Sequence, residues 1–273
     1  MKTRTITAIC MAVVMIPILI WGNHYHIFDA FALVLSLCAA YEFRKMFRTA
    51  KPLPLWIDAL TIIFTGMIYA LLLMRSTELI SWSVLIAVIL ILLVFYGTLL
   101  VFVPAFSGSD FANALATMFF CSVGFFALAF LRTISLNLIL YLLIVAMITD
   151  MFAYFVGMKF GKHKLIPLVS PKKSVEGAIG GLVFGAASAS VFGILTQVFG
   201  ANFSPFLLVL VSIVLSILSQ IGDLVFSKFK RSYGIKDYSN LFPGHGGVLD
   251  RFDSSSFAAM ALLAIVLLLT DLL

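Results

Sequence analysis

Apolar and polar residues follow one another along this chain in long blocks rather than in short periods. Apolar runs of about 18 residues or more recur over the whole length, and short charged segments separate them. A segment that crosses hydrocarbon must satisfy its own backbone groups, so runs of this kind predict helices. The runs are too continuous for the alternating pattern of β-barrel strands. The pattern therefore predicts an all-α, polytopic transmembrane helix bundle.

About nine runs qualify as spans, and the second is short enough to be a re-entrant segment. We expect them at roughly residues 5–22, 27–43, 53–74, 79–98, 109–131, 136–158, 175–199, 204–226 and 254–272. The polar residues are unevenly spread over this scheme. We therefore predict N-terminal membrane spans over 1–135 and a catalytic membrane region over 136–273. The catalytic region carries polar loops at 159–174 and 227–253.

Composition and charge agree with a membrane protein and narrow its partners. Of the 273 residues, 63% are hydrophobic and 11% are charged, and the mean hydropathy is +1.16. The formal net charge of +6 fits apposition to a lipid bilayer. No basic domain with interleaved aromatic residues is present, so a nucleic-acid partner is not expected.

The basic residues predict the orientation of the chain. With a cytoplasmic N-terminus, 16 of the 18 Lys and Arg residues fall on the cytoplasmic side and only Arg75 and Arg132 fall outside. The cytoplasmic set comprises Lys2, Arg4, Arg44, Lys45, Arg48, Lys51, Lys159, Lys162, Lys164, Lys172, Lys173, Lys228, Lys230, Arg231, Lys236 and Arg251. We predict a multi-pass protein of the cytoplasmic (inner) membrane with both polar loops inside. For Arg44–Lys51, a role in topology or contact with lipid headgroups is favoured.

Ionisable residues inside the spans are the first candidates for chemistry. Asp150 lies near the middle of its span and Asp223 near the cytoplasmic end of its own, and an ionisable group inside a span costs roughly 2.5–3.5 kcal/mol at the centre, so both are functional candidates. The alternative is a neutral carboxylic acid that is hydrogen-bonded to a neighbouring helix. Asp29 and Asp58 lie near the ends of spans, where snorkelling explains them.

The segment from Ser227 to Asp253 concentrates cations and carboxylates between two apolar runs. Asp250 and Asp253 are three residues apart, so they share a helical face if the last helix has begun there. If this segment folds back, Asp223 and Asp250 can flank one magnesium ion. Magnesium takes oxygen ligands and needs only one or two carboxylates beside substrate phosphates. The glycines around His245 expose backbone N–H groups that suit an anion, and a direct contact of His245 with phosphate is left open.

Glycines at every fourth position mark one of the later runs. Gly177, Gly181 and Gly185 form a small-residue stripe of the kind that allows close helix packing. The stripe predicts a structural contact and permits a homodimer.

The sequence SKFKRSYGIKDYSNLFPGHGGVLDRFD, at 227–253, resembles the signature of phosphatidate cytidylyltransferases, also called CDP-diacylglycerol synthases. Two further stretches are similar to that family. One runs from Asp150 through Gly157 and Gly161 to Ser170-Pro171-Lys172-Lys173, and the other is Ser219-Gln220-Ile221-Gly222-Asp223-Leu224. The resemblance covers roughly residues 145–255. This chain has Phe226 where many relatives have Glu, and Ser174 where they have Thr.

The resemblance implies the reaction of CTP with phosphatidate to give CDP-diacylglycerol and pyrophosphate. It implies catalytic roles for Asp223, Asp250, Lys228, Lys230, Arg231 and Lys236. It implies substrate binding by Ser170, Lys172, Lys173, His245, Gly246, Gly247 and Arg251. Magnesium is the implied cofactor, held by Asp223 and Asp250. Asp253 is a weaker ligand or orients Arg251, and Asp150 completes the acidic floor or binds a second cation.

Two other functions fit parts of the sequence. A CTP-dependent lipid kinase of the polyprenol type would use similar cations and magnesium but transfer the γ-phosphate, so it would release CDP instead of pyrophosphate. A transporter would use Asp150 and Asp223 as coupling carboxylates in broken helices. Against the transporter, the polar groups gather on one side of the membrane rather than at its midplane.

Overall fold

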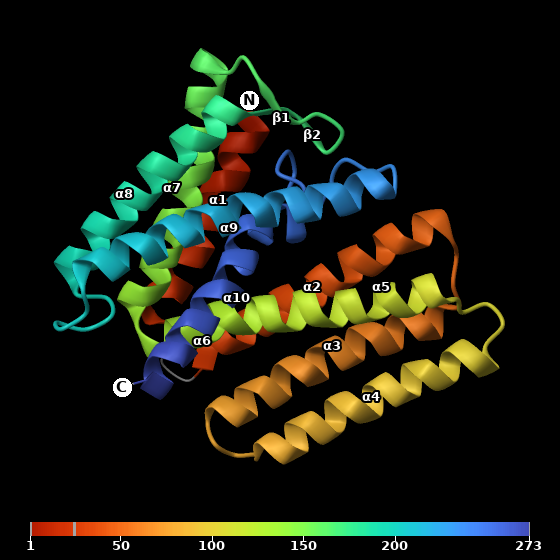
Figure 1. The fold of residues 1–273 in the computed structure, drawn as a ribbon. Helices are drawn as coiled ribbons and strands as arrows, with labels where there is room; N and C mark the ends of the chain where they lie inside the picture. The colour runs from red at the N-terminus through yellow and green to blue at the C-terminus, as the bar shows by residue number, and fades with distance from the viewer. Residues whose placement is uncertain (1, 24–25, 273) are drawn as a thin grey trace. The chain divides into compact units, whose positions relative to one another are not determined.

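A computed structural model of the chain describes residues 2–23 and 26–272, and describes side chains for 5–23 and 26–269. Lys2 and Arg4, which contribute to the predicted orientation, have side chains outside this set. Nine helical rods run through the described residues, as predicted (Figure 1). They are α1 (Lys2–Trp21), α2 (Ile27–Ala50), α3 (Leu55–Ser76), α4 (Trp82–Phe102), the continuous rod of α5 (Gly108–Met118), η2 (Phe119–Val123) and α6 (Gly124–Ile134), then α7 (Leu136–Phe160), α8 (Val175–Thr196), α9 (Pro205–Ser232) and α10 (Leu249–Leu272).

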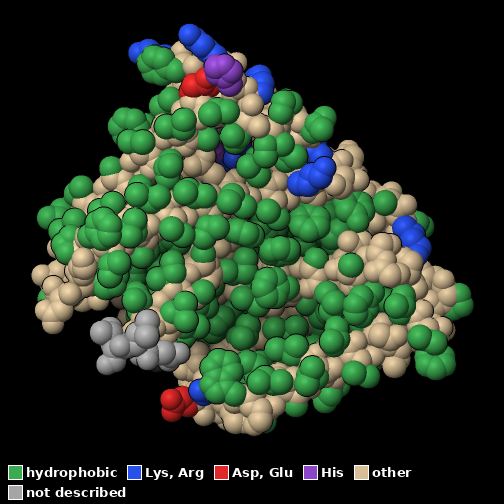
Figure 2. All heavy atoms as spheres, viewed as in Figure 1, with side chains coloured by type: hydrophobic (Ala, Val, Ile, Leu, Met, Phe, Trp, Pro, Cys, Tyr) green, Lys and Arg blue, Asp and Glu red, His purple; other side chains and the backbone are tan. Residues whose placement is uncertain are grey.

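Among the described helices, seven rods are long and apolar enough to cross a membrane. These seven are α3, α4, the α5–η2–α6 rod, α7, α8, α9 and α10. The other two rods are α1, whose described apolar part is Thr5–Trp21, and α2. Hydrophobic side chains cover most of the face drawn in Figure 2, and many large ones, such as Val101 and Phe102, are exposed. The chain is a multi-pass membrane protein, and the predicted helix bundle is confirmed.

Helices continue past the apolar runs at the end of α2, at the end of α9 and at the start of α10, so these three boundaries differ from the predicted ones. α2 extends to Ala50 and α9 to Ser232, so most of the basic residues after each run lie on helix rather than in a loop, whereas Lys51 and Lys236 follow the helices. Lys and Arg are good helix formers, and a helix can continue in water once it leaves the bilayer. The predicted loop at 227–253 is therefore shorter, since only 233–248 lies between α9 and α10.

The all-α prediction misses one small element. The polar segment after α7 forms an antiparallel hairpin from β1 (Lys164–Ile166) and β2 (Ser170–Ser174), in which Lys164 pairs with Ser174. Strands this short carry little periodicity, so nothing in the residue pattern distinguishes them from a loop.

The chain divides into two compact units that interrupt one another in sequence. The N-terminal unit comprises residues 1–130 together with 235–250, and the C-terminal unit comprises 131–234 together with 251–273. We call residues 235–250 the signature segment. This segment belongs with the N-terminal helices although it follows α9 in the chain.

In the N-terminal unit, α3 packs on α2, α4 and α5, and these four helices lie side by side in Figure 1. Their hydrophobic core includes Leu53, Ile57, Tyr96, Phe106, Ala114 and Met118. The π-helical turn η2 lies within the α5–α6 rod, where the Ser36 hydroxyl donates a hydrogen bond of 2.8 Å to the carbonyl of Cys121. The extra residue of such a turn frees a carbonyl, and α2 supplies its donor.

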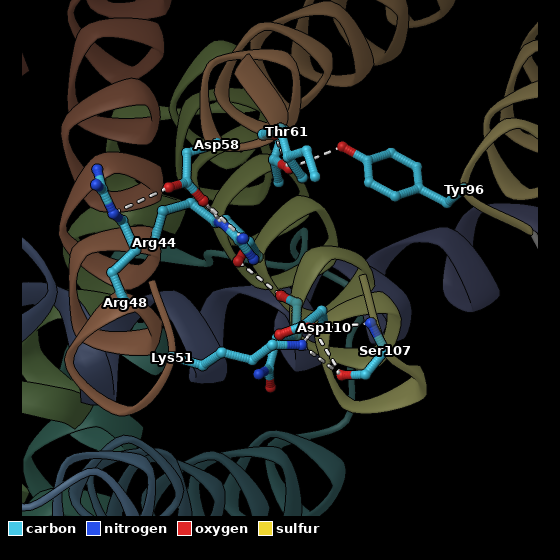
Figure 3. Close-up of polar contacts among 11 residues, drawn as sticks. Arg44, Arg48, Lys51, Asp58, Thr61, Tyr96, Ser107 and Asp110 are labelled. Carbon is cyan, nitrogen blue, oxygen red and sulfur yellow. Dashed lines mark hydrogen bonds and ion pairs between the residues drawn. The ribbon is translucent and has the colours of Figure 1, made fainter. Parts of the chain in front are cut away.

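The same unit contains two pairs of opposite charges, of which the first is buried on both sides (Figure 3). Arg44 lies on α2 and is only 1% exposed. Its Nε donates a hydrogen bond of 2.7 Å to Asp58 Oδ1, and its Nη2 lies 2.6 Å from the same oxygen. Lys51 Nζ lies 2.6 Å from Asp110 Oδ2. The expectation that Arg44 contacts headgroups and that Asp58 snorkels is wrong for both residues, because each side chain is buried against the other.

In the C-terminal unit, α8 packs closely on α7, and α9 packs on both. A Cβ atom at Gly177 would lie 2.5 Å from the carbonyl oxygen of Ala153, and one at Gly181 would lie 2.6 Å from that of Thr149. Only glycine allows the helices this approach, so the predicted packing role of the stripe is confirmed. These glycines contact α7 of the same chain, and the homodimer stays a prediction.

Candidate active site

Three helices of the C-terminal unit each bring one aspartate to the same place. Asp150 lies on α7, Asp223 on α9 and Asp253 on α10, and their charges lie near enough to act on one another. We call these three residues the acidic cluster. The side chain of Asp150 is exposed, while those of Asp223 and Asp253 are half-buried. A substrate can therefore reach the cluster from outside the unit.

Local sequence explains how α9 and α10 come together at the cluster. A Cβ atom at Gly222 would lie 2.5 Å from Cβ of Phe257 and 2.9 Å from the carbonyl oxygen of Asp253. The absence of a side chain at this position lets the backbone of α10 approach α9 beside Asp223. The Gly222-Asp223 pair thus combines a close helix contact with a carboxylate.

Hydroxyl groups hold two of the three carboxylates. Ser254 donates from Oγ to Asp150 Oδ2 at 3.0 Å, and Ser227 donates to Asp223 Oδ1 at 3.1 Å. The backbone N–H of Ser254 donates to Asp253 Oδ1 at 2.8 Å. These hydrogen bonds fix the orientation of the carboxylate oxygens.

Two lysines lie against the cluster from different elements. Lys173, on β2, forms an ion pair with Asp223 Oδ2. Lys230, on α9 and 8% exposed, exerts its positive charge on Asp253. Three carboxylates meet two ammonium groups, which leaves one acid in excess.

The hairpin that carries Lys173 is anchored on both sides. The carboxylate of Glu176 accepts hydrogen bonds from the backbone N–H groups of Lys162 and His163, at 3.1 and 3.2 Å, and Oε1 lies 2.6 Å from Nδ1 of His163. Ser174 caps α8 by accepting a hydrogen bond from Gly177 N at 3.1 Å. The hairpin therefore leaves α7 and enters α8 at fixed points, which limits where Lys173 can reach.

The signature segment has its own internal structure in the N-terminal unit. Asp250 Oδ2 accepts hydrogen bonds from the backbone N–H groups of Tyr238 at 2.8 Å and Gly247 at 2.9 Å. Phe242 N donates a hydrogen bond of 2.9 Å to the carbonyl oxygen of Gly246, and this bond closes the turn. Gly244 and Gly246 have φ values of 78° and 83°, a region that favours glycine. The glycines of this stretch are needed for its backbone path.

Comparison with known proteins identifies the family to which the chain belongs. Residues 2–269 match the cytidylyltransferase family. The chain belongs to this family. It is 36% identical over 269 residues to the phosphatidate cytidylyltransferase of Staphylococcus haemolyticus, covering 98% of this chain and 99% of that protein.

Two further relatives match over a similar length. The identity is 37% over 275 residues to the phosphatidate cytidylyltransferase of Staphylococcus saprophyticus and 36% over 272 residues to that of Staphylococcus aureus strain COL. Each match covers 98% of this chain and 99% of the relative. This member of the cytidylyltransferase family is thus an enzyme that transfers nucleotidyl groups and belongs to phospholipid biosynthesis.

The predicted site residues of this family member fall in both units. The C-terminal unit brings together Asp150, Lys173, Asp223, Lys230 and Asp253, and it also contains Ser170, Lys172, Lys228, Arg231 and Arg251. The signature segment contains Lys236, His245, Gly246, Gly247 and Asp250. Asp223 and Asp250, predicted to share a cation, therefore belong to different units. α10 begins at Leu249, so the condition for Asp250 and Asp253 to share a helical face is met.

A magnesium ion suits the chemistry of the acidic cluster. Across the described side chains, no group of three or more His, Cys, Asp or Glu residues forms a ready-made metal site. Magnesium does not require one, because one or two carboxylates and substrate phosphates are enough. Asp223 and Asp253 supply such oxygens, with Asp150 beside them. The buried Phe226 contributes no ligand, so acids near Asp223 come from α7 and α10 instead.

Prediction from sequence missed Glu42, a buried acid on α2. Its carboxylate accepts hydrogen bonds from Ser239, Val248 and Leu249 of the signature segment. Glu42 lies at the end of an apolar run, where snorkelling would have explained it as it explained Asp29 and Asp58, so no signal in the residue pattern singled it out.

Proposed function

We propose that this enzyme transfers the cytidylyl group of CTP to phosphatidate, giving CDP-diacylglycerol and pyrophosphate. The observation that carries the proposal is the acidic cluster with Lys173 and Lys230 against it, in a chain similar over its full length to phosphatidate cytidylyltransferases. Carboxylates beside cations are the equipment for moving phosphorus between oxygen atoms, since that reaction depends on placing and neutralising charge.

In the proposed reaction, a phosphate oxygen of phosphatidate attacks the α-phosphorus of CTP. A new P–O bond forms, the bond between the α-phosphorus and the bridging oxygen to the β-phosphorus breaks, and pyrophosphate leaves with that oxygen. The attacking group is already an anion at neutral pH, so no side chain has to remove a proton from it. The work left to the enzyme is to hold two negatively charged substrates in line.

Lys173 and Lys230 have different parts in holding those charges. Lys173 pairs with Asp223 and is half-buried, so it can exchange this partner for a phosphate oxygen when substrate arrives. Lys230 is buried and stays as a fixed positive charge beside Asp253. Lys172, Lys228, Arg231 and Lys236 are exposed and would add phosphate contacts from solvent.

Magnesium would be held by Asp223 and Asp253, with Asp150 as a further ligand or as the site of a second cation. When bound, the ion neutralises phosphate charge and orients the triphosphate. Asp250 stays a predicted ligand, and one of its oxygens accepts two backbone hydrogen bonds. Asp223 Oδ2 is paired with Lys173, so binding of the ion there requires Lys173 to move.

We further propose that the reaction takes place on the cytoplasmic side of the cytoplasmic membrane. The proposal rests on the distribution of Lys and Arg residues, since both polar regions of the chain fall on the strongly basic side. CTP is a soluble nucleotide, whereas phosphatidate can approach the exposed Asp150 sideways from the bilayer, because its diacyl tails need no aqueous route.

Turnover of CTP by the purified full chain in detergent tests the proposal. We expect pyrophosphate and a CDP-lipid in equal amounts when phosphatidate and magnesium are present, and neither when EDTA replaces magnesium. Release of CDP with a newly phosphorylated lipid would instead identify a kinase. Absence of CTP consumption with every divalent metal would contradict the proposal and favour the transporter.

A further inference from the structure

The feature that the proposed function leaves unused is the carboxylate of Glu42. Glu42 lies on α2, is 2% exposed, and is surrounded by the signature segment about 200 residues later in the chain. Its Oε1 accepts hydrogen bonds from Ser239 Oγ at 2.6 Å and from Val248 N at 2.9 Å. Its Oε2 accepts one from Leu249 N at 3.0 Å. A single buried acid therefore fixes both ends of the turn that contains Gly244–Gly247.

Two of these three donors belong to the start of α10. The first N–H groups of a helix have no acceptor within the helix, and a side chain normally supplies one from the residue just before it. Here the acceptor comes from α2 instead. A negative charge at a helix N-terminus also interacts favourably with the helix dipole. Glu42 thus defines where α10 begins and where the preceding turn ends.

The residue next to this carboxylate, Gly247, has to be a glycine because the carboxylate occupies the space of a side chain. A Cβ atom at Gly247 would lie 2.5 Å from Glu42 Cδ, so no other residue fits there without displacing the acid. The backbone of Gly247 also donates to Asp250. Gly247 is therefore held between Glu42 on one side and Asp250 on the other.

The turn held in this way has a feature that points to a ligand. Nδ1 of His245 is buried and has no hydrogen-bond partner among the described residues. A buried polar atom without a partner costs free energy, and a substrate oxygen or N–H group could supply the missing hydrogen bond. Glycine stands on either side of His245, so the backbone N–H groups of the turn carry no side chains of their own that would cover them.

We infer that Glu42 is a positioning residue for the nucleotide, acting through the signature segment. The inference rests on the proposed function, because it assigns the segment 239–249 to binding of CTP. Within the N-terminal unit, α2 supplies the acceptor that holds the turn in its binding form. Binding of the lipid substrate does not depend on this contact.

The first test is Glu42→Gln in the full chain in detergent. Glutamine has the same length, but one oxygen becomes an NH2 group that faces a backbone N–H, so at least one charged hydrogen bond is lost. Loss of such a bond shifts the equilibrium between the binding form of the turn and its other forms by about 10- to 150-fold, and the affinity for CTP falls with the population of the binding form. We expect the dissociation constant and KM for CTP to rise by at least tenfold, with KM for phosphatidate within about twofold of wild type. Glu78→Gln, the same change at an exposed glutamate, is the matched control.

A milder variant covers the case in which Glu42→Gln does not fold. Ser239→Ala removes one of three hydrogen bonds and leaves Glu42 with both backbone donors, so a rise of about two- to tenfold in KM for CTP is expected. Amide hydrogen exchange gives a readout independent of turnover. The amides of Val248 and Leu249 should exchange faster in Glu42→Gln than in the Glu78→Gln control.

The outcomes separate this inference from the proposed function. If wild type and Glu78→Gln bind no CTP and release no pyrophosphate, the proposed function fails. If they do both and Glu42→Gln keeps the wild-type KM and dissociation constant for CTP, Glu42 is not a positioning residue. A lower melting temperature with unchanged CTP constants would show that Glu42 serves stability alone and would also overturn the inference. If Glu42→Gln does not fold, an unchanged KM for CTP in Ser239→Ala has the same meaning.

Discussion

One group of ionised side chains in each unit of this enzyme lies among apolar helices, and the two groups balance their charges differently. In the N-terminal unit every buried acid of the network in Figure 3 has a base, as Asp58 has Arg44 and Asp110 has Lys51. In the C-terminal unit, the acidic cluster of three aspartates faces two lysines, Lys173 and Lys230. The balanced pairs tie helices together. The unbalanced cluster has a charge left over for a cation.

The difference follows from the cost of removing charge from water. A buried pair is tolerated when both partners are present, and it becomes strongly destabilising when one is removed. A cluster with an excess of acid is not at its lowest free energy until a cation arrives. We therefore expect substitutions in the first network to reduce stability and substitutions in the second to reduce activity. Four experiments test this division, from the largest expected effect to the smallest.

Asp58→Asn should destabilise the protein most. Asparagine keeps the shape of the side chain but leaves Arg44, which is 1% exposed, without its counter-charge. Breaking a buried pair in this way costs about 3–5 kcal/mol in the free energy of unfolding. A thermal melt in detergent measures it, with Glu78→Gln as the control. A melting temperature equal to wild type would show that the Arg44–Asp58 pair does not hold the unit together.

Asp223→Asn should give the converse result. Loss of one charged group that acts on the reacting phosphates is expected to lower kcat/KM for CTP about 10²- to 10³-fold. The melting temperature should stay within a few degrees of wild type, because the substitution removes repulsion from Asp150 and Asp253. Steady-state release of pyrophosphate and a melt on the same preparation provide both numbers. Full activity, or a protein that no longer folds, would remove the distinction between the two units.

Lys173→Met should have a smaller effect on the same reaction. Lys173 pairs with Asp223, so we expect a loss of roughly tenfold in kcat/KM from weaker phosphate binding. The double variant with Asp223→Asn sharpens the test, because residues in contact give non-additive effects. Additive losses would mean that Lys173 and Asp223 act separately.

Asp110→Asn should have the smallest effect of the four. Its partner Lys51 has a side chain that is 43% exposed, so the pair is screened by solvent and contributes at most about 1 kcal/mol. Asparagine can still accept the hydrogen bond that Ser107 N donates at 2.8 Å. A melting temperature as low as that of Asp58→Asn would show that exposure of the lysine does not weaken the pair.

Much of the fold could be predicted because the signal is local. Each of the nine apolar runs corresponds to one helical rod, and the glycine stripe at Gly177, Gly181 and Gly185 packs as expected. Asp150 and Asp223 could be selected because ionisable groups are rare inside spans. The hairpin and the helical extension of α9 to Ser232 could not be predicted, because polar segments outside the bilayer show no regular spacing of apolar residues.

The partners of the buried charges could not be predicted from single segments of the chain. Whether Arg44 faces lipid headgroups or Asp58 depends on how α2 packs on α3, and the residue pattern of either helix alone does not determine it. The same holds for Glu42, whose partners are 197 to 207 residues away. A tertiary contact overrides an expectation that was reasonable for each segment taken singly.

The long separation between Glu42 and the signature segment also affects how the protein is made. Val248 follows Glu42 by 206 residues, and synthesis proceeds at about 5–20 residues per second, so α2 waits roughly 10 to 40 s for its partner. During that interval the first helices are inserted while a buried acid still lacks its donors. The N-terminal unit, although translated first, is therefore among the last parts of the chain to be completed.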